Sequence, residues 1–63
     1  MTVNPEDVMS IGNRLLEQYP GTFTDDFSRN KDAVRNLTDL RSIHLRNRIA
    51  GYITRQQQSN AGA

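Results

Sequence analysis

Residues 42–57, SIHLRNRIAGYITRQQ, decide the fold because they carry two different stripes at helical spacing. The apolar residues Leu45, Ile49, Tyr52 and Ile53 share one arc when each residue turns the helix by about 100°, which is typical of a helix packed on a core. Ser42 is a candidate N-cap for this helix. We therefore expect a helix over about residues 42–57.

The second stripe on this segment is basic. Arg41, His44, Arg48, Gly51 and Arg55 recur at steps of three and four residues, so they project from one side of the predicted helix. Guanidinium groups bind phosphate oxygens, and a glycine between them lets a phosphate backbone come close to the helix. The pattern favours a nucleic-acid-binding face over a merely solvated one.

Four other assignments in this segment stay open. Arg46 lies off the basic stripe, so it either pairs with an acid of an earlier helix or contacts a second strand. Asn47 projects toward a base edge, a ribose or water. Tyr52 adjoins the core, and we expect a buried ring with its hydroxyl at the rim, base stacking being the weaker alternative. Gly51 could instead serve a close helix crossing opposite Gly12.

The net charge of +1 conceals a strong asymmetry along the chain. Residues 1–40 contain all seven acids and four of the bases, whereas residues 41–63 contain four arginines and no acid. This distribution is typical of a protein that places a polyanion-binding face on one element.

A first helix is expected over about residues 5–19. Asn4 followed by Pro5 is typical of an N-cap with proline at the first helical position. The Pro20-Gly21 pair should end the helix, because proline and glycine interrupt helical backbone.

A second helix is expected over about residues 29–38, capped by Ser28 or Asp26. Residues 58–63 have no apolar periodicity and should form a flexible tail. The chain is therefore predicted to be all-α, a small three-helix domain over residues 1–57 with a frayed C-terminal tail. The predicted core consists of Val8, Leu15, Tyr19, Phe27, Leu37, Leu45, Ile49 and Ile53.

The composition argues against an enzyme. The chain has one histidine and no cysteine, and the pair Asp25-Asp26 is more typical of a turn than of a catalytic dyad. We expect no cofactor, no metal and no small-molecule substrate. Apolar residues never run beyond two in succession, so we expect neither a secretory signal nor a membrane span.

Three blocks of the sequence together resemble a known family. They are Pro20-Gly-Thr-Phe-Thr-Asp-Asp-Phe27, Asn30-Lys31 and Leu45-Arg-Asn-Arg-Ile-Ala-Gly-Tyr-Ile-Thr-Arg55. Their order and spacing are similar to those of the archaeal and eukaryotic small-subunit ribosomal proteins called seventeen-e, most closely the short archaeal type. The similarity covers about residues 8–56.

The resemblance implies a cytoplasmic helical protein in the head of the small ribosomal subunit, held by ribosomal RNA and neighbouring ribosomal proteins. Its functional positions would be Arg46, Asn47, Arg48, Gly51, Tyr52 and Arg55, with Asn30 and Lys31. Family members usually begin with a basic segment, whereas Asn4 to Asp7 carries two acids. We therefore expect a greater reliance on the third helix for RNA binding.

Two other functions compete with this interpretation. A DNA-binding three-helix module would use the third helix in a major groove, but such modules usually dimerise or carry a basic arm. A protein-interaction adaptor would use the acidic face of the first two helices and would bind partners without nucleic acid.

Overall fold

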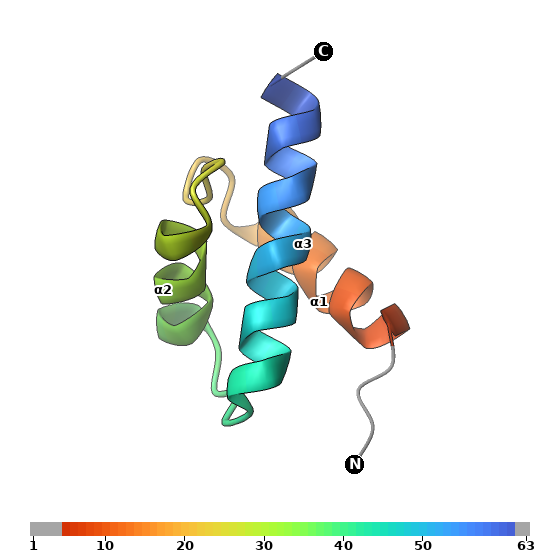
Figure 1. The fold of residues 1–63 in the computed structure, drawn as a ribbon, viewed down its shortest axis with the longest axis vertical. Coiled ribbons are helices and arrows are strands. Elements are labelled where there is room, and N and C mark those ends of the chain that lie inside the picture. The colour runs from red at the N-terminus through yellow and green to blue at the C-terminus, as the bar shows by residue number, and fades with distance from the viewer. Residues whose placement is uncertain (1–4, 62–63) are drawn as a thin grey trace.

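A computed structural model describes the backbone of residues 5–61 and the side chains of residues 7–59. It contains helices α1 (Pro5–Gln18), α2 (Phe27–Leu37) and α3 (Ile43–Ala61). Helix α3 lies between the other two, with α2 on one side and α1 crossing behind it (Figure 1). Because residues 5–61 hold three helices and no strand, the predicted all-α fold is confirmed.

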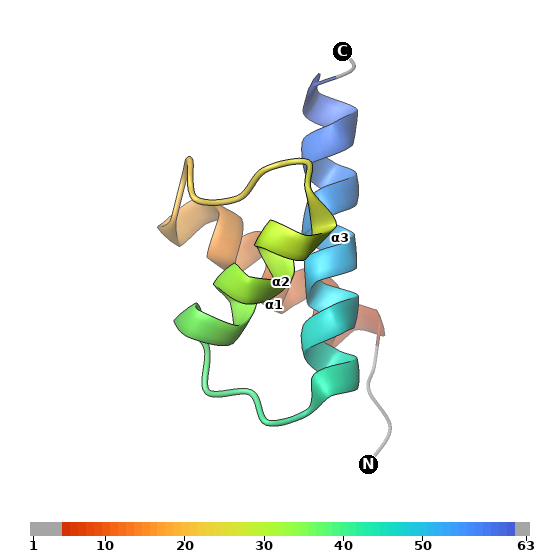
Figure 2. The ribbon, with the colours of Figure 1, turned by 60° about the vertical axis from the view of Figure 1, so that its left-hand side comes forward.

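Helix α1 ends where the Pro20-Gly21 pair predicted. The Thr22 backbone N–H donates to the Tyr19 carbonyl at 3.2 Å, and Gly21 has a φ of +86°. A positive φ at the third position of a turn that has proline at the second is the arrangement of a type II turn, which favours glycine. The chain then leaves α1 and crosses toward α3 before α2 begins (Figure 2).

Helix α2 begins at Phe27, two residues earlier than predicted, because Asp26 is its cap. The Asp26 carboxylate accepts hydrogen bonds from the backbone N–H groups of Ser28 at 2.9 Å and Arg29 at 3.4 Å. The predicted cap of α3 is confirmed, since the Leu45 N–H donates to the Ser42 hydroxyl at 3.2 Å.

Helix α3 continues to Ala61, so residues 58–61 are helical rather than part of a non-helical tail. Residues 62–63 of the predicted flexible tail lie outside the described residues, as does the predicted cap Asn4. Glutamine and serine are tolerated in helices, and the lack of an apolar stripe after Gln57 was too weak a reason to end one there.

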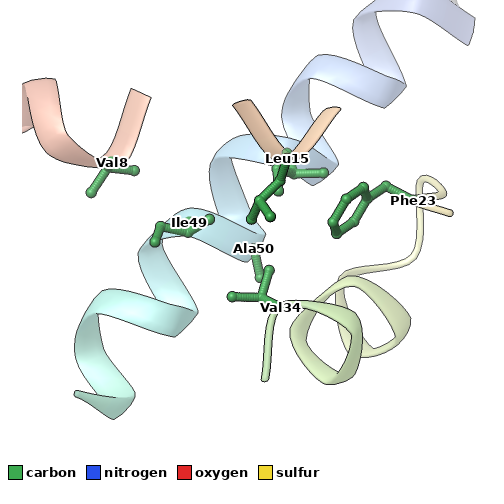
Figure 3. Close-up of a cluster of buried hydrophobic side chains, with 7 residues drawn as sticks. Val8, Leu15, Phe23, Val34, Ile49 and Ala50 are labelled. Atoms are coloured by element: carbon green, nitrogen blue, oxygen red, sulfur yellow. The ribbon is translucent and has the colours of Figure 1, made fainter. Parts of the chain in front are cut away.

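The core forms where α1, α2 and their connection meet the inner face of α3 (Figure 3). Ile49, Ala50 and Ile53 of α3 are fully buried, as is Val34 of α2. Val8, Leu15 and Phe23 complete the buried cluster. Four of the eight predicted core residues are therefore buried, namely Val8, Leu15, Ile49 and Ile53, while Leu37 and Leu45 are partly buried against the cluster.

Two predictions for the core were wrong. Tyr19 is 36% exposed because it lies past the end of α1, in the turn that carries the chain away from this helix. Phe27 is 42% exposed because Phe23, in the connection before α2, takes the buried position instead. The Gln57 amide holds that connection by donating to the Phe23 carbonyl at 3.3 Å.

Candidate nucleic-acid interface

The basic residues predicted on the third helix lie on its exposed side. His44, Arg48 and Arg55 are exposed, and their spacing places them together around Gly51. Arg41 is exposed as well, but it belongs to the connection before α3, which begins at Ile43. We call His44, Arg48, Gly51 and Arg55 the basic face of α3.

Gly51 is not the glycine of a close helix crossing. A Cβ atom added at Gly51 would meet only Cε1 of Phe27, at 3.9 Å, which is an ordinary van der Waals contact. A Cβ added at Gly12 would lie 2.6 Å from Cδ2 of Tyr52. The close approach of α1 to α3 therefore depends on Gly12, and the packing alternative for Gly51 is wrong.

Tyr52 fills the space that Gly12 leaves open. Its ring is half-buried against α1, and its hydroxyl donates to Oδ1 of Asn13 at 2.8 Å. The hydroxyl thus lies at the rim as predicted, whereas the ring is half-buried rather than buried. Its hydroxyl and one side of its ring are already engaged within the chain.

A groove between α2 and α3 adjoins the basic face. Its lining carries three basic side chains and one acid, and its residues are Lys31, Asp32, Arg35, Ile43, Arg46 and Asn47. The half-buried Arg46 faces α2 and lines this groove. Arg35 was missed by the sequence analysis, although it lies one helical turn after Lys31. Asn47 sits between the groove and the basic face, because it precedes Gly51 by one turn.

Phe27 stands at the edge where α2 meets the basic face. Its ring edge lies over Gly51, and the Lys31 ammonium lies 5.9 Å from the ring centroid. Phe27 was not predicted at the surface, because its ring was assigned to the core.

Asn30 differs from the other predicted site residues because its side chain lies in the interior. It is fully buried, and all of its polar groups have partners within the chain. Its Oδ1 accepts from the Thr24 N–H at 2.9 Å, and its Nδ2 donates to the Thr24 carbonyl at 2.6 Å and to the Thr54 hydroxyl at 2.7 Å. Because its hydrogen bonds join the connection to α3, Asn30 has a structural role, and its contact with RNA stays a prediction.

The other side of the molecule is less basic. A groove between α1 and the end of α2 is lined by Ile11, Leu15, Leu37 and Leu40, with Arg14 and Asp39 among its polar residues. Residues 5–61 contain no helix that is long and apolar enough to cross a membrane. Within the same described part, no three His, Cys, Asp or Glu side chains gather where they could bind a metal ion.

Over residues 5–61, the fold thus defines a small all-helical protein, with a basic face on α3. A family model described as Ribosomal S17 matches residues 2–59, nearly the whole chain. The chain belongs to this family, S17e, and its role is that of a structural constituent of the ribosome rather than an enzyme.

Archaeal relatives agree with this assignment. The chain is 50% identical over 60 residues to "Small ribosomal subunit protein eS17" of Haloquadratum walsbyi, covering 95% of this chain and 90% of the relative. The protein of the same name from Pyrobaculum neutrophilum is 55% identical over 53 residues, covering 84% and 75% of the two chains. That from Halorubrum lacusprofundi is 46% identical over 61 residues, covering 97% and 95%.

Proposed function

We propose that this protein assembles into the small ribosomal subunit in the cytoplasm and binds ribosomal RNA through the basic face of α3. The relatives carry the name of that subunit, which supports the first part. The observation that supports the second is the exposure of Arg48 and Arg55 on either side of Gly51, in a stretch of the chain without acids. Binding to neighbouring ribosomal proteins also belongs to this proposal.

The groove between α2 and α3 extends the proposed surface. Lys31, Arg35 and Arg46 would neutralise phosphates that continue past the basic face, and Asn47 would donate or accept a hydrogen bond between the two regions. Only one acid, Asp32, lines this groove. RNA would therefore cross from α3 onto α2, rather than follow α3 alone.

Two charge-reversal variants, Arg48→Glu and Arg55→Glu, test the proposed RNA-binding face. Both should weaken binding of the full chain to small-subunit ribosomal RNA and flatten the dependence of affinity on salt. For every phosphate that is no longer neutralised, the magnitude of the negative slope of log affinity against log salt should decrease by about 0.7 to 0.9, because fewer counterions are released. Binding titrations at several salt concentrations measure this slope.

Arg14→Glu is the matched control, since Arg14 is an exposed arginine on α1 that lines the other groove. It should change the slope less than either variant of α3. If all three variants behave alike, the basic face has no special role in binding. Cosedimentation of the tagged wild-type chain with small subunits tests assembly separately, and migration at the top of a sucrose gradient would contradict it.

A further inference from the structure

We propose that Phe27 and Gly51 form a seat for one unpaired base of the bound RNA. This inference rests on the proposed function and gives it a specific ligand group, a nucleobase stacked on the Phe27 ring. Protein groups that bind phosphates position RNA but do not by themselves select an unpaired nucleotide.

The exposure of the Phe27 ring is the first observation. At 42% exposed, Phe27 leaves much of a large apolar side chain in water at the first position of α2. The buried aromatic position nearby is already taken by Phe23, which is 5% exposed. Core packing therefore does not explain the aromatic ring at residue 27.

Gly51 lies directly beside the Phe27 ring on the surface of α3. Within the described part of the chain, the only neighbour that a Cβ atom at Gly51 would meet is Cε1 of this ring, at an ordinary van der Waals distance of 3.9 Å, so no other side chain crowds the ring from Gly51. A base that stacks on the ring could also rest against the backbone at Gly51. Any longer side chain at this position would occupy that space.

The charges around the seat match a nucleotide rather than an apolar protein segment. The Lys31 ammonium lies 5.9 Å from the ring centroid, and Arg48 and Arg55 flank Gly51 along α3. A stacked base brings its phosphates within reach of such groups. Aromatic stacking with adjacent cations is a common way to bind single-stranded nucleic acid.

Comparing Phe27→Leu with Phe27→Tyr shows whether RNA binding needs an aromatic ring at residue 27 or only an apolar side chain. Phe27→Leu should weaken binding to the small-subunit ribosomal RNA of the source organism by roughly 5- to 10-fold, near the lower limit for removing one stacked base. Phe27→Tyr keeps the ring and should bind within about twofold of wild type. The salt slope should be unchanged in both, because no charge is removed.

Gly51→Leu and Gly51→Ala test the space beside the ring. The leucine should fill the seat and reduce RNA affinity as much as Phe27→Leu does, whereas the alanine should have a smaller effect. Thermal melts of the free variants show whether each is folded, and a Cβ atom at Gly51 meets the Phe27 ring only at an ordinary van der Waals distance.

Three outcomes are distinguishable. Wild-type affinity in both Phe27→Leu and Gly51→Leu, with Arg48→Glu still weakened, would overturn the base seat and leave the proposed RNA-binding face standing. If these two leucine variants bind RNA normally but fail to enter small subunits, a protein neighbour covers Phe27, and the proposed base site is also overturned. Failure of the wild-type chain itself to bind RNA would instead contradict the proposed function.

Discussion

Gly12 and Gly51 each lie inside a continuous helix, where glycine has low helix propensity, but their surroundings differ. Gly12→Ala should destabilise the free protein by about 1 kcal/mol, because overpacking against Tyr52 costs about 1 to 3 kcal/mol and better helix propensity returns about 1. Gly51→Ala should stabilise it by up to about 1 kcal/mol, since the new methyl group meets only the Phe27 ring at an ordinary distance. Urea unfolding of both variants measures the difference.

A loss of stability in Gly12→Ala together with a gain in Gly51→Ala would show that Gly12, and not Gly51, serves the helix crossing. Two variants of equal stability would mean that Tyr52 rotates away from α1 at little cost. Tyr52→Phe gives a useful comparison, because it removes the hydrogen bond to Asn13 while keeping the ring in place. Which of the two glycines serves the helix crossing was left open by the sequence, because it depends on where α1 crosses α3.

At the scale of one element, α3 was the most predictable part of the chain. Its apolar arc and its basic stripe follow from a period of 3.6 residues, which needs no knowledge of the partners. Helix α2 was less predictable, because Asp26 and Ser28 are both good caps and only the geometry of the connection selects Asp26. That choice starts α2 at Phe27 and leaves Phe23 to be buried from the connection.

Asn30 decides how the connection before α2 is held against α3. Asn30→Ala should lower the free energy of unfolding by about 2 to 3 kcal/mol, because it leaves groups of Thr24 and Thr54 without their partner. Asn36→Ala, at an exposed position of the same helix, should change it by less than about 0.5 kcal/mol. Chemical denaturation measures both.

The same pair of variants shows whether Asn30 stabilises the fold, binds RNA, or does both. When Asn30→Ala is kept folded at low temperature, its RNA affinity and its salt slope should both equal those of the wild type. A stable Asn30→Ala protein with weakened RNA binding would contradict a purely structural role and support the predicted RNA contact. The sequence resemblance could not distinguish these roles, because it identifies a position without showing whether the side chain is buried.

The whole molecule consists of one central helix with a partner on each side, and both α1 and α2 pack against α3. Such an arrangement leaves the core small, since each flanking helix is covered mainly on the side that faces α3. A chain of 63 residues buries only about 60% of its unfolded surface, so its stability alone should be marginal. The proposed RNA-binding face lies on the same helix that forms much of the core, and RNA binding should therefore stabilise the entire fold.

Ribosomal RNA at 100 times its dissociation constant should add about 2.7 kcal/mol to the stability of the folded chain. Backbone amides of Ile49 and Ile53, at the centre of α3, should then exchange hydrogen for deuterium about 100-fold more slowly, provided that they exchange by global unfolding. The protection should disappear at high salt, because the added stability comes from binding to phosphates. Mass spectrometry of the full chain with and without RNA measures it. Equal exchange in the two samples at saturating RNA would mean that RNA binds the folded and unfolded chains alike, so that it does not recognise the arrangement of α2 and α3.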